Sequence, residues 1–383
     1  MFGSDDPPPA PETPPPPPVE PEPVPTPATD PPAQTGGFTI PGLPGLTIPL
    51  PQPNGQATPV EREPPARGSL PAVPPGSYDA NGFMTRQFLD AEAEAIHQAL
   101  LAALDERERQ QVGQIPLSIV IEHEEPNAAA ACIRQGGTTE ARMMITSAML
   151  ELCAGIAEAK AYDEIAGTHT YEDYVTTVVD LIRRGQPVRG VEASVHPGPH
   201  NVDPHKLARQ RHLFEQQVSF ILGHELAHHY LGHTNCVSGR SDAQIERDEM
   251  SSVLAHTIPP FEQPREVEAD MWGTVDAMEA GRERPEGTWT EEGALLNLDF
   301  FRRLTDRGGE EILLAFLSTH PPSIVRMPIV QSTAQQWTPG WRPPRMPVPG
   351  ETTNNPLGIP IPTNLPIDPS QLPIPLPFPP RQQ

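Results

Sequence analysis

Two histidines and a glutamate within one short segment are the residues of this chain whose spacing is most specific for chemistry. His224, Glu225 and His228 follow the pattern HExxH, in which one helical turn separates the imidazoles and both leave the same helix face. Two imidazoles so placed can bind one tetrahedral Zn²⁺ at about 2.0–2.1 Å each. Glu225 is then placed to accept a proton from the attacking water rather than to bind the metal. The apolar surroundings indicate a buried helix, so the pattern predicts a zinc peptidase site over a chance match.

A third protein ligand is expected, because catalytic zinc sites bind three side chains and keep one position for water. The metzincin pattern HExxHxxGxxH would need glycine and histidine where the chain has Leu231 and Thr234. His233 is one place off and is interpreted as a histidine at the helix C-terminus. His229 points about 100° away from His228 and is interpreted as an ordinary packed or exposed histidine.

The segment 265–273 offers a better candidate for the third ligand. Glu266 and Asp270 are four residues apart, so they share one face of a helix that begins near Pro264. Glu266 can then bind zinc while Asp270 orients a ligand histidine. Glu268 lies off that face and is interpreted as a solvated charge.

Four segments, in the same order along the chain, resemble one family. HELAHHYLGH at 224–233 and EVEAD at 266–270 are similar to the gluzincin metallopeptidases of the CAAX-prenyl-protease and HtpX-like family. Residues 125–150 are similar to that family's strand pair beside the active-site cleft, and residues 318–326 to its downstream STHPxxxxR element. Together the segments span a little over half of the chain.

The resemblance implies an α+β fold, with a mostly helical zincin-like metallopeptidase domain, a small β-sheet at the cleft, and one bound Zn²⁺. The implied site residues are the zinc ligands His224, His228 and Glu266, the general base Glu225, the oxyanion donor His320, the orienting residue Asp270, and the substrate-binding residues Arg326, Asn127 and Ala128. The polar run between Ala131 and Ile145 is longer than the family's tight connection. The strand pairing at the cleft edge therefore stays open.

Proline is concentrated at the two ends of the chain. With 54 prolines in 383 residues, residues 1–77 and 337–383 are expected to be extended, disordered, proline-rich arms. Apolar proline stretches in both arms are interpreted as spacers, with docking of a partner's aromatic-lined groove as the alternative. Residues 78–336 remain as one zinc metallopeptidase domain, long enough to bury a single core.

Hydrophobic periodicity predicts the elements of this domain. A helix is expected at about 85–110, followed by strands near 116–121, 127–133 and 142–146. Further helices are expected at about 147–160, 171–184, 204–231, 264–280, 290–305 and 310–317. This order indicates a small sheet packed on mostly helical structure.

The remaining histidines and the cysteines are less specific. His196, His200 and His205 could form a second metal site, but their spacing matches no ligand geometry, so an exposed loop near the cleft is preferred. The three cysteines, Cys132, Cys153 and Cys236, leave at least one unpaired in a monomer. A free-thiol interpretation suits a reducing compartment.

Charge and hydropathy limit the partners. A net charge of −24 argues against a nucleic-acid partner, which would need a basic face. No stretch approaches the about 20 apolar residues of a membrane-spanning helix, and the amino end lacks the basic and apolar regions of a secretory signal. These features favour the cytoplasm, with the cell envelope as the alternative.

Two classes of function remain. The leading hypothesis is a zinc endopeptidase that hydrolyses extended or misfolded polypeptides, which could bind an open strand edge by β-addition. The alternative is a catalytically weak metal-binding adaptor or scaffold that acts through its proline-rich arms.

Overall fold

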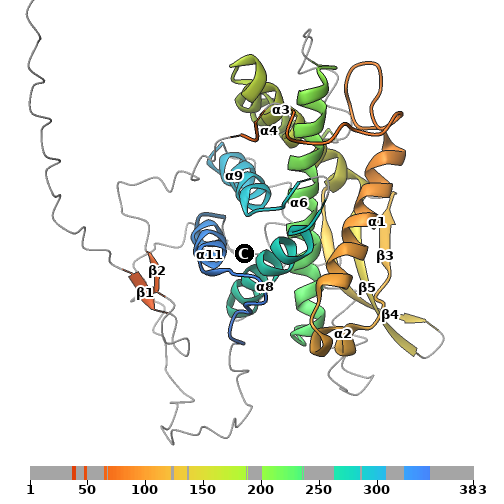
Figure 1. The fold of residues 1–383 in the computed structure, drawn as a ribbon, viewed down its shortest axis with the longest axis vertical. Coiled ribbons are helices and arrows are strands. Elements are labelled where there is room, and N and C mark those ends of the chain that lie inside the picture. The colour runs from red at the N-terminus through yellow and green to blue at the C-terminus, as the bar shows by residue number, and fades with distance from the viewer. Residues whose placement is uncertain are drawn as a thin grey trace, which may run out of the picture. The chain divides into compact units, whose positions relative to one another are not determined.

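The structure, a computed structural model, describes residues 37–39, 47–49, 64–66, 68–121, 125–135, 138–186, 188, 201–234, 236, 263–284, 287–307 and 323–345. Its helices are α1 (Arg86–Ala103), α2 (Glu106–Val112), α3 (Ser147–Ala166), α4 (Thr170–Arg183), α6 (Pro204–Tyr230), α8 (Gln263–Gly281), α9 (Glu292–Asp306) and α11 (Ser323–Gln336). Its strands are β1 (Gly37–Thr39), β2 (Thr47–Pro49), β3 (Leu117–Val120), β4 (Ala128–Gln135) and β5 (Thr138–Thr146). The described part is mostly helical with a small three-stranded sheet, which is the expected α+β class (Figure 1).

Helix α6, which carries the HExxH segment, is the central helix of the fold. Asp203 caps its N-terminus by accepting the His205 backbone N–H at 2.8 Å, and Pro204 occupies the first turn, where no N–H is needed. The helix packs against α1, α3, α8 and α9 (Figure 1). Side chains are therefore buried on all sides of α6, as expected of a core helix.

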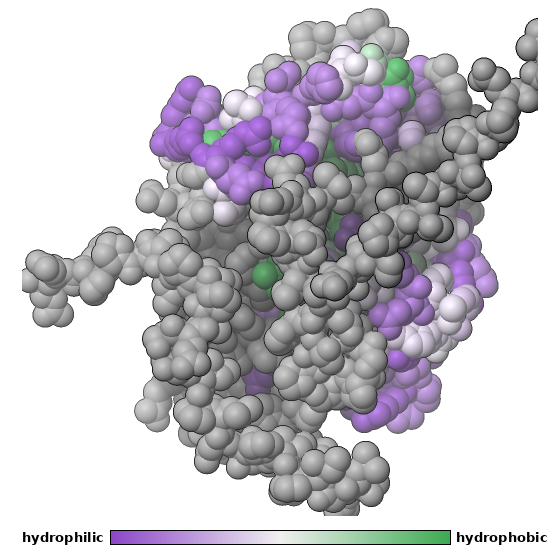
Figure 2. Space-filling view, turned by 90° about the vertical axis from the view of Figure 1, so that its left-hand side faces the viewer, coloured by the Kyte–Doolittle hydropathy of each residue, from purple (hydrophilic) through white to green (hydrophobic). Residues whose placement is uncertain are grey.

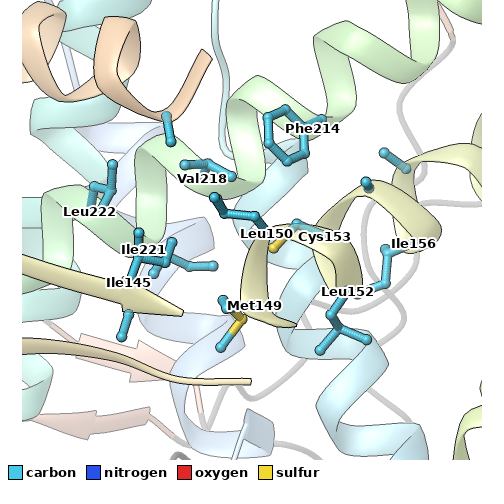
Figure 3. Close-up of a cluster of buried hydrophobic side chains, with 14 of the residues drawn as sticks. Ile145, Met149, Leu150, Leu152, Cys153, Ile156, Phe214, Val218, Ile221 and Leu222 are labelled. Carbon is cyan, nitrogen blue, oxygen red and sulfur yellow. The ribbon is translucent and has the colours of Figure 1, made fainter. Parts of the chain in front are cut away.

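The main apolar core lies where α3 and α6 pack beside β5 (Figure 3). Thr146 ends β5 and accepts the Met149 backbone N–H at 3.2 Å, so its side chain caps α3 directly after the strand. The labelled core residues are Ile145, Met149, Leu150, Leu152, Cys153, Ile156, Phe214, Val218, Ile221 and Leu222. Each large apolar side chain buried in this way contributes about 1.5–3 kcal/mol, and together they fix α6 against the sheet.

The sheet has the order β3-β5-β4, with β3 parallel and β4 antiparallel to β5. Ala128 pairs with Ile145, and Gln135 pairs with Thr138. The polar run that left the pairing open therefore extends both strands instead of separating them. Among the described strands, β4 has a partner only on its β5 side, so it is an edge strand.

Four elements, α2, α11, β1 and β2, differ from the sequence-based expectation. The helix expected at 85–110 is divided, because Asp105 accepts the Glu108 backbone N–H at 2.9 Å and caps a new helix, α2. Helix α11 was not predicted, since Pro328 lies inside it and proline disfavours a helix interior. Strands β1 and β2 pair within the arm that was expected to be extended and disordered, so this part of it forms ordered backbone pairs. The helix expected at 310–317 lies outside the described residues.

The surface of the described part is largely polar. Figure 2 shows mostly hydrophilic residues where the described chain reaches the surface on the face in view. The exposed large hydrophobic residues are Ile121, Val202 and Val325, which come from three separate segments. No helix in this part of the chain is long and apolar enough to cross a membrane.

The segment after α11 is tied to the helical core by Arg342. Its Nη1 donates to Asp276 at 3.0 Å, and its Nη2 donates to the Ala103 carbonyl at 3.1 Å. Asp276 is 1% exposed and also accepts the Tyr230 hydroxyl at 2.7 Å. Burial raises the pKa of Asp276 to about 6, although Arg342 and Tyr230 lower it. Part of the segment expected to belong to the carboxyl-terminal arm thus contacts α1 and α8.

Arg342→Ala should lower the free energy of unfolding by about 3–5 kcal/mol above about pH 7, because it leaves a buried carboxylate without its cation. The folded pKa of Asp276 is raised, so stability from its protonated form is present at low pH and is lost as the pH rises through about 6. Removing Arg342 raises the pKa of Asp276 further, so the variant loses more stability than wild type as the pH rises. The difference in the free energy of unfolding between variant and wild type should therefore widen between about pH 5 and pH 8. Urea denaturation at both pH values measures it.

The matched control is Arg282→Ala, since the Arg282 side chain is 40% exposed and pairs with Glu279 at the surface. Exposed ion pairs contribute about 0–1 kcal/mol, so this variant should unfold like wild type. An Arg342→Ala cost at about pH 8 as small as that of the control would contradict the assigned role of Arg342.

Candidate metal centre

His224, His228 and Glu266 converge at one point between α6 and α8. The Nε2 atoms of His224 and His228 are 3.1 Å apart, and they lie 3.3 and 3.4 Å from the Glu266 carboxylate oxygens. Ligand atoms at the corners of a tetrahedron around zinc, each about 2.0–2.1 Å from the metal, would be about 3.3 Å apart. The two His–Glu266 contacts use different carboxylate oxygens, Oε2 to His224 and Oε1 to His228, and the ligand atoms of the three residues all lie within 4.8 Å of one another. The three residues named from the sequence are therefore close enough to bind one metal ion. They are the only such cluster within the described residues.

A close approach of two helices brings these residues together. A Cβ atom at Gly273 would lie 2.6 Å from the His224 backbone nitrogen, and one at Gly223 would lie 2.9 Å from the Gly273 carbonyl oxygen. Only glycine at both positions allows the backbones of α6 and α8 to touch here. Because Glu266 and Gly273 are two turns apart on α8, the contact also places Glu266 toward α6.

Asp270 and Arg326 form a buried ion pair behind His224. Asp270 Oδ1 lies 3.0 Å from His224 Nδ1, while Arg326 donates from Nε at 2.9 Å and from Nη2 at 2.6 Å to the Asp270 carboxylate. Burial alone would raise the pKa of Asp270, but Arg326 and His224 outweigh it and lower this pKa to about 2. A charged Asp270 accepts the His224 Nδ1–H, which leaves the Nε2 lone pair toward the ligand cluster.

Arg326 does not lie where the family resemblance implied. It was expected to contact substrate, but it is 3% exposed and directs two donors at Asp270. Its guanidinium also lies over the Phe220 ring, 5.9 Å from the ring centroid. A buried cation with this bidentate geometry fixes Asp270 rather than a bound chain.

The charges around His224 favour a cation at the cluster. Burial lowers the pKa of His224, but hydrogen bonds to Asp270 and Glu266 outweigh it and raise this pKa to about 9. A proton on His224 and a divalent cation are both positive charges that the two carboxylates stabilise. The charges around the ligand cluster therefore agree with its geometry.

The donor atoms and charges indicate what the site can bind. No family model, curated protein or solved structure matches the chain. Two imidazoles and one carboxylate form the three-ligand set of catalytic zinc sites that keep a fourth position open.

His233 and Glu268 lie behind the second histidine. His233 Nδ1 is 3.0 Å from His228 Nδ1, and His233 Nε2 is 3.3 Å from Glu268 Oε2. Burial lowers the pKa of His233. Glu268 is 6% exposed, so its interpretation as a solvated charge was wrong. The reason is that α8 packs against α1, α6 and α11, which leaves it little solvent-facing surface.

Glu225 lies against the edge strand β4. Its Oε2 accepts the Ala130 backbone N–H at 2.8 Å, and the residue is 4% exposed. The Asn127 carbonyl accepts the Thr146 N–H, so Asn127 directs its backbone groups at β5. Alternate residues of an antiparallel strand direct their backbone groups to opposite sides, so Ala128 and Ala130 direct theirs away from β5, where the Ala130 N–H meets Glu225. Of the two expected substrate contacts, Ala128 lies on this edge, while the Asn127 backbone is used within the sheet.

Two further contacts hold α6 and the chain beyond it to the sheet. His229 Nε2 lies 3.2 Å from the Arg142 carbonyl oxygen, and burial lowers the pKa of His229 to about 4. It is therefore the packed histidine that the sequence allowed. A disulfide joins Cys132 on β4 to Cys236 after α6, and only Cys153 is free. The free-thiol interpretation therefore holds for Cys153 but not for Cys132 and Cys236.

Some expected site residues are not placed by the structure. His320, the expected oxyanion donor, lies outside the described residues, as do His196 and His200. His205 lies in the first turn of α6. The sequence analysis assigned His233 and Glu268 no place beside the ligands. For His233 there was one signal, because a glycine after a helix end predicts a left-handed turn that folds the next residue back.

Proposed function

We propose that this chain is a zinc-dependent endopeptidase with a zincin-like fold, acting on extended polypeptides. The observation that carries the proposal is the convergence of His224, His228 and Glu266, whose ligand atoms all lie within 4.8 Å of one another, with Glu225 next to the first ligand in the sequence. The resemblance of four segments to the gluzincin metallopeptidases supports the same assignment.

The residues of the site have separate roles in this reaction. Zinc held by His224, His228 and Glu266 would act as a Lewis acid that polarises the scissile carbonyl and lowers the pKa of water. Glu225 accepts the proton of the attacking water and returns it to the leaving amine. Asp270, held by Arg326, keeps His224 in the tautomer that presents Nε2 to the metal.

The edge of β4 suggests how a substrate is held. Ala128 and Ala130 direct backbone groups away from β5, and Glu225 is bonded to the Ala130 N–H. A polypeptide that adds to this edge as a further strand would run beside the Glu225 carboxylate. Pairing by backbone groups requires an extended chain and depends little on its sequence. This favours unfolded or misfolded polypeptides as substrates.

Metal removal tests the proposal. The purified chain should contain about one zinc per molecule, lose cleavage of unfolded casein after treatment with 1,10-phenanthroline, and regain it when zinc is added back. Metal analysis and gel-based cleavage assays measure both quantities. Cleavage that persists in fully metal-free protein would contradict the proposal, and zinc binding without cleavage would favour the adaptor alternative.

A further inference from the structure

We propose that His233 and Glu268 form a hydrogen-bonded relay that orients the zinc ligand His228. The relay is the counterpart of the Asp270–Arg326 pair behind His224. This inference rests on the proposed zinc site and adds two positioning residues to it.

The proton positions follow from the geometry of the two imidazoles. His228 Nε2 faces the ligand cluster and must keep its lone pair to bind a metal, so the ring carries its proton on Nδ1. That proton points to His233 Nδ1 at 3.0 Å, which must therefore be the acceptor. His233 then carries its own proton on Nε2, 3.3 Å from Glu268 Oε2. One arrangement of protons satisfies every contact from carboxylate to metal ligand.

A local turn holds His233 in this position. Gly232 has φ +77°, a left-handed conformation that ends α6 and reverses the chain. The His233 backbone N–H then donates to the His228 carbonyl at 2.9 Å. The backbone of His233 is thus fixed to the residue whose ring its side chain contacts.

Helix geometry explains why a histidine is needed between Glu268 and His228. Two residues along a helix correspond to about 200° of rotation, so Glu268 cannot share the face on which Glu266 approaches the metal. The His233 ring spans the remaining distance and transmits the carboxylate's charge to His228 Nδ1. The side chains of His233 and Glu268 are only 8% and 7% exposed. Water therefore screens the hydrogen bond between them poorly.

The test compares zinc binding by full-length variants. His233→Phe keeps a ring without nitrogen atoms, and Glu268→Gln keeps the shape without the charge. Both should weaken zinc affinity by about 10–100-fold, as loss of such outer partners of metal ligands typically does. Competition with a chromophoric chelator measures the affinity, and the visible spectrum of the Co²⁺-loaded protein should change in both variants.

Three comparisons separate positioning from folding. His233→Asn, which retains an acceptor for the His228 Nδ1–H, should bind zinc more tightly than His233→Phe. Glu279→Gln, on the same helix α8, should bind zinc like wild type. Thermal unfolding of the metal-free proteins identifies any variant that fails to fold. If His233→Phe fails, the zinc affinity of Glu268→Gln, the most conservative change, decides whether the relay exists.

The outcomes distinguish this inference from the proposed function. Zinc affinities within about twofold of wild type, with unchanged Co²⁺ spectra, would overturn the relay while leaving the zinc site intact. A wild-type chain that binds no zinc would overturn both.

Discussion

Glu225→Gln should retain zinc and lose about 10²–10⁴-fold in the rate of peptide hydrolysis, the contribution typical of a positioned general base. The amide has the shape of the carboxylate but cannot accept the proton of the attacking water. None of the three ligand atoms is changed, so zinc content should be that of wild type. The amide oxygen can still accept the Ala130 N–H that Glu225 accepts at 2.8 Å, so β4 should keep its position. Steady-state cleavage of a fluorogenic peptide, together with metal analysis, measures both effects.

The chain offers a matched control in the same helix. Glu215 lies on α6 about ten residues, or about 15 Å, before Glu225. Glu215 is buried, like Glu225, and it accepts the Trp289 Nε1–H at 3.2 Å, a bond that an amide oxygen can keep. Glu215→Gln therefore makes the same exchange of carboxylate for amide away from the ligand cluster. This variant should cleave like wild type. Wild-type turnover by Glu225→Gln would remove Glu225 from the mechanism.

The convergence of His224, His228 and Glu266 was predictable because its geometry is mostly local. His224 and His228 share a face on any α-helix, and so do Glu266 and Asp270, whatever surrounds them. The helix expected at 204–231 is observed as Pro204–Tyr230, since an aspartate cap, a proline in the first turn and a terminal glycine mark its ends. Sequence reasoning needed only one long-range assumption, that the two helices meet.

Asp270 was predicted to orient a ligand histidine, but the buried positions of Arg326 and Glu268 were not predictable, because tertiary packing decides them. Arg326 is buried against Asp270 by α11, a helix that Pro328 concealed from pattern analysis. Glu268 has the composition of a surface residue, and only the packing of α8 against three other helices buries it. The contact at Gly273 likewise depends on a residue distant in sequence, Gly223.

Removing the third ligand should have the largest effect on zinc binding. Glu266→Ala leaves two imidazoles, so zinc affinity should fall by more than the about 10–100-fold expected for the outer partners His233 and Glu268. Peptidase activity should be lost with the metal. Because Asp270 and Arg326 remain paired, the metal-free variant should still fold. Chelator competition and metal analysis measure the affinity, and far-ultraviolet circular dichroism checks the fold.

Glu279→Ala is the matched control for this prediction, since it removes a carboxylate from the same helix, α8, away from the cluster. It should bind one zinc with wild-type affinity. The ordering of the three glutamates is the decisive result: Glu266 affects zinc most, Glu268 less and Glu279 not at all. That order is expected because Glu266 belongs to the ligand cluster, Glu268 acts through one histidine, and Glu279 lies outside the cluster near the other end of α8. Zinc binding by Glu266→Ala at wild-type affinity would mean that the third ligand comes from elsewhere in the chain.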